Sequence, residues 1–303
     1  MNKQKPAFPA VEKDQWWETI RKELRGKPEE MLFTQWFEGL ETPPFHSWED
    51  ERPDAALFPA YSWHASERIG PERMQAQALD ALNRGADGLL VETNPSTHLS
   101  DGLKNVQLEF LRLAISPEKP EGPWKEQWTA LLSERNQVGR KLNTALNYDP
   151  FARMAEKGRL ETNVKDEIRS VEHSREIGLF RHAFFVDTHP YQISGARIDT
   201  QLGIALATAY EWMQQGAEAK TDDFHFSFAQ GREYLLEIAK LRAFRELWPY
   251  FLNEIGLKPS KDVAFVSACS SDRHFSASDP HGNLLRLTTM AMSSILGGAQ
   301  NVM

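Results

Sequence analysis

The chain has 303 residues, enough for one large α/β domain with a short appendage, and its single cysteine, Cys269, excludes an internal disulfide. A net charge of -8 argues against nucleic acid or an anionic membrane as the main partner, because both attract basic surfaces. No apolar run reaches the roughly 20 residues that a membrane span needs, and the N-terminus lacks the apolar core of a signal peptide. We therefore expect a cytoplasmic protein in which Cys269 is a buried structural thiol.

Residues 1–50 are expected to form an N-terminal arm outside the main domain. A helix is predicted at 15–26, with Asp14 as its cap and Gly26 as its stop. The segment that follows, up to Phe45, is rich in aromatic residues and proline but has no regular period. Such a segment has no core of its own, so it must cover an apolar surface of this chain or of a partner. Residues 46–56 are expected to be a charged linker.

From residue 57 onward, predicted strands alternate with predicted helices. Apolar or alternating runs predict seven strands and the start of an eighth, at 57–63, 86–94, 106–116, 141–150, 183–187, 224–230, 263–271 and 297–303. Helical spacing of apolar residues predicts helices at 71–85, 124–136, 233–248 and 283–296, one before 218, and one in the charged stretch 156–175.

The unit at 224–248 shows this alternation most clearly. Phe224, Phe226 and Phe228 fall on one face of the strand, and a long amphipathic helix follows Gly231. Seven or eight such units in about 250 residues predict a (β/α)8 TIM-type barrel over 51–303 that ends in its eighth strand. An open doubly wound sheet is the alternative, but no glycine-rich nucleotide motif supports it.

In a barrel of this kind, chemistry takes place at the carboxyl ends of the strands. The residues there are Asp187 and His189 after strand five, Gln230 and Arg232 after strand six, and Asp272 to His274 after strand seven. Asp187 and His189 would share one face of an extended strand, which suits a metal or a shared proton. A polar rim without metal is the favoured interpretation, because such pairs are common by chance.

A second candidate motif is Asp279-Pro280-His281-Gly282. It resembles the Asp-x-His-x-x-Gly sequence of cobalamin-binding domains, in which the histidine ligates cobalt. Here the glycine follows the histidine directly. We expect these residues to cap the helix that starts near Asn283.

Four stretches resemble the methylmalonyl-CoA mutase family, the adenosylcobalamin-dependent acyl-CoA mutases. EIAKLRAFRELW at 237–248 is similar to the helix after strand six of that family. Residues 8–45 are similar to the N-terminal arm of the family's small (β) subunits, and residues 78–92 to the helix and strand two of those subunits. Residues 284–303 are similar to the helix after strand seven and the start of strand eight. Residues 94–180 match poorly.

The resemblance implies a barrel whose bore takes the pantetheine arm of acyl-CoA, and a C-terminal domain that holds cobalamin. It further implies the interconversion of methylmalonyl-CoA and succinyl-CoA by radical rearrangement. No cobalamin-binding domain is recognised in this sequence. Adenosylcobalamin is therefore expected in the assembled enzyme and not on this chain alone.

The resemblance also implies that this chain is not catalytic. Aligned on Gly195-Ala196, Pro190 stands where catalytic chains carry the histidine that contacts the substrate thioester. The charged run of strand seven is replaced by residues 265–268, and Trp63-His64-Ala65 offers no counterpart to the family's tyrosine. In two-chain mutases the small subunit pairs with the catalytic large subunit as a heterodimer, and we expect this role here.

The candidate pocket lies at the barrel mouth and bears no predicted catalytic or metal-binding residue. Its expected members are Asp187, His189, Tyr191, Gln192 and Gln230. The alternatives are a barrel that binds acyl-CoA without turnover, and one with its own chemistry at Asp187 and His189.

Overall fold

The structure is a computed structural model of the whole chain, and it describes residues 11–37, 39–46, 62–159, 163–215, 220–258 and 264–303. The chain divides into two compact units, residues 1–58 and 59–303, and each is described by itself.

The first unit contains the predicted helix and a small hairpin. Helix α1 spans Lys13–Leu24, the 3-10 turn η1 spans Glu29–Leu32, and strands β1 (Thr34–Phe37) and β2 (Leu40–Thr42) pair antiparallel. The predicted cap was wrong: α1 is capped at Glu12, whose backbone amide donates to Gln15 Oε1 (3.4 Å), and Asp14 lies inside the first turn. The hairpin was not expected in a segment without regular period.

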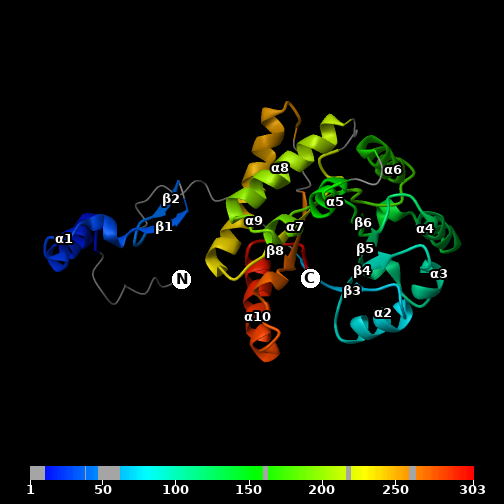
Figure 1. The fold of residues 1–303 in the computed structure, drawn as a ribbon, viewed down its shortest axis with the longest axis horizontal. Helices are drawn as coiled ribbons and strands as arrows, with labels where there is room; N and C mark the ends of the chain where they lie inside the picture. The colour runs from blue at the N-terminus through cyan, green and yellow to red at the C-terminus, as the bar shows by residue number, and fades with distance from the viewer. Residues whose placement is uncertain (1–10, 38, 47–61, 160–162, 216–219, 259–263) are drawn as a thin grey trace, which may run out of the picture. The chain divides into compact units, whose positions relative to one another are not determined.

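The second unit confirms the predicted barrel (Figure 1). Its described strands form one parallel sheet in the order β6-β5-β4-β3-β10-β9-β8-β7. A bridge between Ala145 and His182 joins β6 to β7 and closes the ring. The strands are β3 (His64–Ile69), β4 (Gly88–Thr93), β5 (Arg112–Pro117), β6 (Thr144–Leu146), β7 (Phe184–Asp187), β8 (Phe224–Gln230), β9 (Phe265–Ser270) and β10 (Asn301–Val302).

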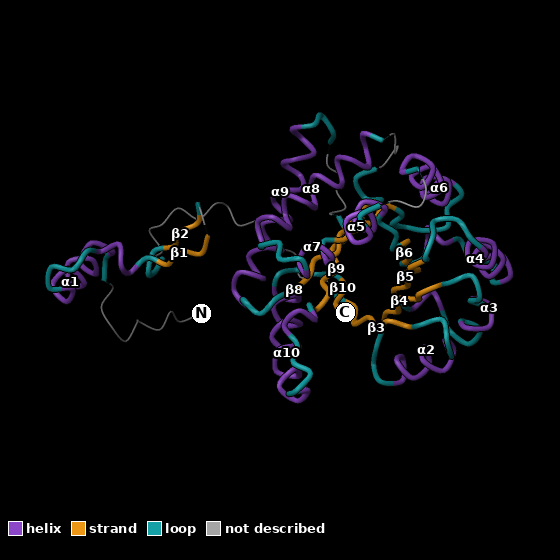
Figure 2. Tube along the Cα trace, viewed as in Figure 1, coloured by secondary structure: helices purple, strands orange, loops and turns teal. Residues whose placement is uncertain are grey.

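Helices surround the ring of strands (Figure 2). They are α2 (Met74–Asn83), α3 (Leu99–Gly102), α4 (Pro123–Glu134), α5 (Pro150–Lys157), α6 (Val164–Glu176), α7 (His189–Ile193), α8 (Ile198–Gln214), α9 (Tyr234–Glu254) and α10 (Pro280–Leu296). Short 3-10 turns η2 (Leu108–Phe110), η3 (Gly139–Lys141) and η4 (Asp272–His274) complete the loops.

Two predicted strands start later in the structure, and one helix was not predicted. The first barrel strand was placed at 57–63, but β3 begins at His64, and residues 57–61 lie outside the described ones. The third strand was expected from residue 106, yet η2 precedes β5, which starts only at Arg112. Helix α5 was missed; Asp149 caps it by accepting from the amides of Phe151 and Ala152.

The alternation in β8 places two kinds of side chain on its two faces, as predicted. Phe226 and Phe228 pack against Phe244 of α9, with ring centroids 4.6 and 4.8 Å apart. His225 instead faces inward, 4.9 Å from the ring of Phe185 on β7. The large apolar core therefore lies between sheet and helices, and the bore takes the remaining, more polar side chains.

A glycine pair tests the packing between η3 and the segment before β7. A Cβ at Gly139 would collide with the backbone carbonyl of Leu179, whereas a Cβ at Gly203 of α8 would meet open space. We expect Gly139→Ala to lower the free energy of unfolding by about 1–3 kcal/mol. Gly203→Ala should raise it by about 0.5–1 kcal/mol, since alanine suits a helix interior better. Urea unfolding of both variants checks this, and equal effects would contradict the packing described.

Candidate active site at the barrel mouth

The lower part of the bore is filled by four side chains, which we call the bore plug: Arg112, His182, His225 and Phe265. All four are buried, and Arg112 is only 1% exposed. The Arg112 guanidinium lies 3.9 Å from the centroid of Phe265, and its Nη2 lies 3.4 Å from His225 Nδ1. The rings of His182 and Phe265 are 4.9 Å apart. The plug thus spans from β5 to β7, β8 and β9 across the bore.

The charge in the bore plug rests on one residue. Burial, and after it the charge of nearby Arg181, lowers the pKa of Arg112 to about 9, so the guanidinium still carries a proton at neutral pH. Burial, with Arg112 as the next cause, holds the pKa values of His182 and His225 well below the usual range. Among the described residues no carboxylate forms an ion pair with Arg112, whose Nη1 donates to Asn143 Oδ1 (3.0 Å).

Above the bore plug, at the carboxyl ends of the strands, lies a cavity of about 540 Å³, which we call the mouth cavity. Its floor includes Leu90, Phe185 and Met303. Its wall holds charged residues from six elements or their adjoining turns, namely Arg68, Glu92, Asp149, Arg153, Glu156, Asp187, His189 and Asp272. The mouth cavity is where barrel geometry predicts chemistry.

Two of the predicted pocket residues line the mouth cavity, and three do not. Asp187 ends β7 and His189 begins α7, so they lie on a turn and not on one strand face; Asp187 Oδ1 accepts from the His189 amide (3.0 Å). Gln192 accepts from Ser271 Oγ (2.6 Å), and Tyr191 Oη donates to the Phe151 carbonyl (3.4 Å). Gln230 is the last residue of β8 and is fully buried.

Asp149 is a site residue that the sequence did not single out. Its Oδ2 accepts from the amide of Asp187 (2.9 Å), while Oδ1 accepts from the first turn of α5. Burial raises the pKa of Asp149 to about 7, although the hydrogen bond from the backbone amide of Asp187 lowers it. Burial likewise raises the pKa of Asp187. The tyrosine beside them, Tyr191, has a raised pKa because of burial and both carboxylates.

The titration of Asp149 gives a prediction for stability against pH. With a folded pKa near 7 and an unfolded pKa near 3.8, the folded state binds more protons between these values. Stability relative to Asp149→Asn should therefore fall by about 1.4 kcal/mol for each pH unit from about pH 5 to 7, and then level off. Urea unfolding of both proteins across this range measures the slope. A flat difference would mean that Asp149 stays ionised when folded.

Two other predicted features are now placed. Cys269 was expected to be a buried structural thiol, but it is only partly buried and lines the mouth cavity. Burial raises the pKa of its thiol to about 11. It is therefore a poor nucleophile at neutral pH. The expected cap at Asp279 is confirmed, because its Oδ1 accepts from the amide of Gly282 (3.0 Å) at the start of α10. His281 is exposed there, which does not fit a buried cobalt ligand.

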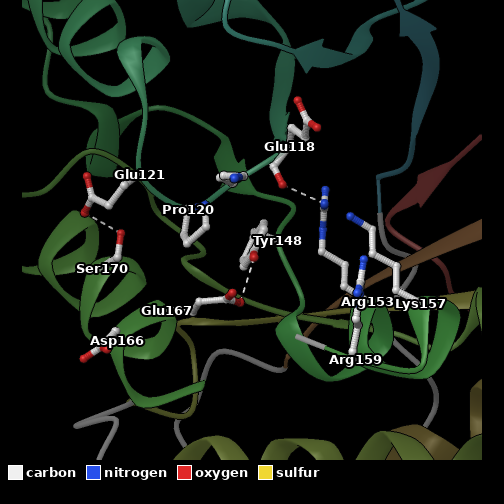
Figure 3. A pocket seen from close by; sticks show the side chains of 11 residues that line it. Glu118, Pro120, Glu121, Tyr148, Arg153, Lys157, Arg159, Asp166, Glu167 and Ser170 are labelled. Atoms are coloured by element: carbon white, nitrogen blue, oxygen red, sulfur yellow. Dashed lines mark hydrogen bonds between the residues drawn. The ribbon is translucent and has the colours of Figure 1, made fainter. Parts of the chain in front are cut away.

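A smaller cavity of about 160 Å³ lies beside α5 and α6 (Figure 3). Its polar groups are largely bonded to one another: Tyr148 donates to Glu167 Oε2 (2.7 Å), Ser170 to Glu121 Oε1 (2.5 Å), and Arg153 Nη1 to the Glu118 carbonyl (2.7 Å). These bonds hold the loop after β5 onto the helices. We therefore interpret this cavity as structural.

A buried charged pair inside the barrel wall was not predicted from the sequence either. Lys240 and Glu237 lie on the buried face of α9, with Nζ 2.5 Å from Oε2, and Lys240 is 1% exposed. Lys240 also donates to the carbonyl of Ala229, and Glu237 Oε1 accepts from the amide of Gly231 (2.8 Å).

Within the described ranges, no three His, Cys, Asp or Glu side chains gather as a metal site would require. Among those same residues, no helix is both long and apolar enough to cross a bilayer.

Comparison with known proteins decides the family. Residues 72–303 match the family model described as methylmalonyl-CoA mutase. This chain belongs to the methylmalonyl-CoA mutase family. It is 27% identical to proteins named methylmalonyl-CoA mutase small subunit from Porphyromonas gingivalis and from Streptomyces virginiae, over 97% of this chain and 53% of each relative. The chain thus spans about half the length of the curated relatives it matches.

A shorter match reaches a mutase named without a subunit. The methylmalonyl-CoA mutase of Rhizobium meliloti is 34% identical over 37% of this chain and 17% of its own length. Among solved structures, a dihydropteroate synthase from Yersinia pestis has a TM-score of 0.44 and 11% identity, over 80% of this chain and 85% of that one.

Proposed function

We propose that this chain is the non-catalytic small-subunit barrel of a methylmalonyl-CoA mutase. It would pair with a catalytic large subunit, which would bind adenosylcobalamin and interconvert methylmalonyl-CoA and succinyl-CoA. The two relatives named small subunit support the pairing, since they match along nearly the whole chain. The role of this barrel would be to support the fold and position of its partner.

The bore plug is the observation that carries this proposal. By the resemblance, a catalytic barrel threads the pantetheine arm of acyl-CoA through its bore. Here Arg112 and Phe265 stack across that path and are nearly inaccessible to solvent. Displacing them would break the hydrogen bond of the Arg112 guanidinium to Asn143 and its contact with the Phe265 ring, which costs on the order of 2–3 kcal/mol.

The lining of the mouth cavity also supports a non-catalytic role. Pro190, which stands at the family's histidine position, lies in the first turn of α7 and lines the mouth cavity. Proline has no side-chain donor and no proton to transfer. The carboxylates around it are also ill suited to the negative charge of a methylmalonyl or succinyl group.

The chain alone should therefore neither bind nor convert the substrate. We expect no turnover of succinyl-CoA with added adenosylcobalamin, and no shift of the melting temperature at millimolar succinyl-CoA. A catalytic large subunit assayed in parallel is the positive control. Saturable binding of succinyl-CoA, with displacement of the bound succinyl-CoA by free CoA alone, would contradict a plugged bore. That result would favour an acyl-CoA-binding barrel.

A further inference from the structure

The mouth cavity is well formed, yet the proposed support role does not use it. Five carboxylates line it, those of Glu92, Asp149, Glu156, Asp187 and Asp272, against two arginines. Both arginines already have partners, and the partner of Arg68 is Glu92, one of these five carboxylates. Arg68 Nη1 pairs with Glu92 Oε1 (3.0 Å), and Arg153 donates to the carbonyls of Pro117 and Glu118 (2.7 Å each).

The carboxylates that remain face the cavity without a cation. In the described part of the chain, no lysine or arginine forms an ion pair with Asp187 or Glu156. Among the residues that the structure describes, only His189 pairs with Asp272, and its Nε2 lies 3.9 Å from Asp272 Oδ1. Asp149 supports Asp187 from behind, by accepting from its amide. Negative charge is thus held in place at one side of the cavity.

An independent observation also indicates a missing hydrogen-bond partner. Asn147 is 6% exposed and lines the mouth cavity, where alternation along β6 and its extension puts it on the same side as the bore-facing Ala145. Its Oδ1 is buried and has no hydrogen-bond partner among the described residues. A buried amide oxygen without a partner is uncommon, because leaving it unpaired costs about 1–3 kcal/mol.

We propose that the mouth cavity binds a small organic cation, a primary ammonium on an aliphatic body, through Asp187 and Asn147. The ammonium group has three donors and no acceptor, which suits a wall of carboxylate and amide oxygens. The apolar floor of Leu90, Phe185 and Met303 suits methylene groups. A metal ion fits less well, since no three ligating side chains converge within the described ranges.

The pH dependence of binding follows from the groups around Asp187. Those facing it are Arg68 on β3, Glu92 on β4, Asp149 before α5, Arg153 and Glu156 on α5, His189 on α7, Cys269 on β9 and Asp272 on η4. Because burial raises the pKa values of Asp149 and Asp187, a cation should release protons as it binds. Affinity should therefore rise with pH, as the carboxyl groups around the cavity lose their protons.

Three four-carbon probes test the proposal by calorimetric titration of the full chain: putrescine, 1,4-butanediol and succinate. We expect saturable binding of putrescine and none of the neutral or anionic probe. Asp187→Asn should weaken putrescine binding at least about tenfold. The matched control, Asp101→Asn on the exposed surface of α3, removes the same charge and should change nothing. Glu156→Gln, at an exposed position of α5 that lines the cavity, should weaken binding without endangering the fold.

Two results would overturn the proposal: equal binding of all three probes, or unchanged putrescine affinity in both Asp187→Asn and Glu156→Gln. A further probe, N-acetyl-lysine methylamide, separates the possible sources of the ammonium. Binding as tight as that of putrescine would indicate a lysine of a partner chain, and much weaker binding would indicate a free amine. Neither result depends on whether the chain pairs with a mutase large subunit.

Discussion

Replacing Lys240 by alanine is expected to lower the free energy of unfolding by about 3–5 kcal/mol. The variant leaves the carboxylate of Glu237 buried without its cation, and it leaves the carbonyl of Ala229 without its ammonium donor. Burial lowers the pKa of Lys240, while Glu237 raises it, so the charged state depends on this one partner. Urea unfolding followed by circular dichroism measures the effect.

Two controls separate the buried pair from the loss of a side chain. Lys165→Ala, at an exposed position of α6, should change stability by less than about 0.5 kcal/mol. The double variant Glu237→Gln with Lys240→Met removes both charges, so we expect it to recover most of the loss. A Lys240→Ala variant that is as stable as Lys165→Ala would show that the pair does not hold β8 and α9 together.

Deleting residues 1–45 is expected to leave a folded barrel that no longer pairs with a large subunit. No residue of α1 is buried, and Val11, Met31 and Trp36 are 60%, 56% and 41% exposed. The arm's aromatic rings contact one another, with the Trp16 and Phe45 centroids 3.9 Å apart. Each exposed aromatic that a partner buries would contribute on the order of 2 kcal/mol to association.

Co-purification with a tagged large subunit measures this pairing. The double variant Met31→Ser with Trp36→Ala tests the exposed apolar side chains of the arm, and Lys22→Ala on α1 is its control. We expect the former to weaken pairing and the latter to leave it unchanged. Undiminished co-purification of the deletion variant would mean that the barrel alone makes the interface.

The barrel could be predicted because most of its strands face apolar helices. β4 and β8 have nearly continuous burial, and their sequences show it. β3 differs, because His64, Ser66 and Arg68 face a polar bore, so its sequence lacks the apolar pattern of a buried strand. The prediction therefore placed this strand too early, at the apolar residues that precede β3. Helix α5 was missed because the prediction assigned its cap Asp149 and its first residue Pro150 to a strand at 141–150, although an aspartate followed by proline is typical of a helix start.

Two residues that line the mouth cavity were named from the sequence, but most of its lining was not. The strand-end rule found Asp187 and His189, because it depends only on topology. Arg112 was missed between Leu111 and Leu113, although strand parity places it on the bore side with Ala114. Asp149 and Asn147 were missed because their roles depend on β6 lying beside β7, a neighbour that is distant in the sequence.

Co-expression with a catalytic large subunit tests the proposed support role most directly. The complex would be purified and its mass measured by light scattering, and its turnover of succinyl-CoA would be assayed with adenosylcobalamin. We predict a one-to-one complex that is active, while this chain alone is inactive. A chain that stays monomeric beside the large subunit, or that converts succinyl-CoA by itself, would contradict the account.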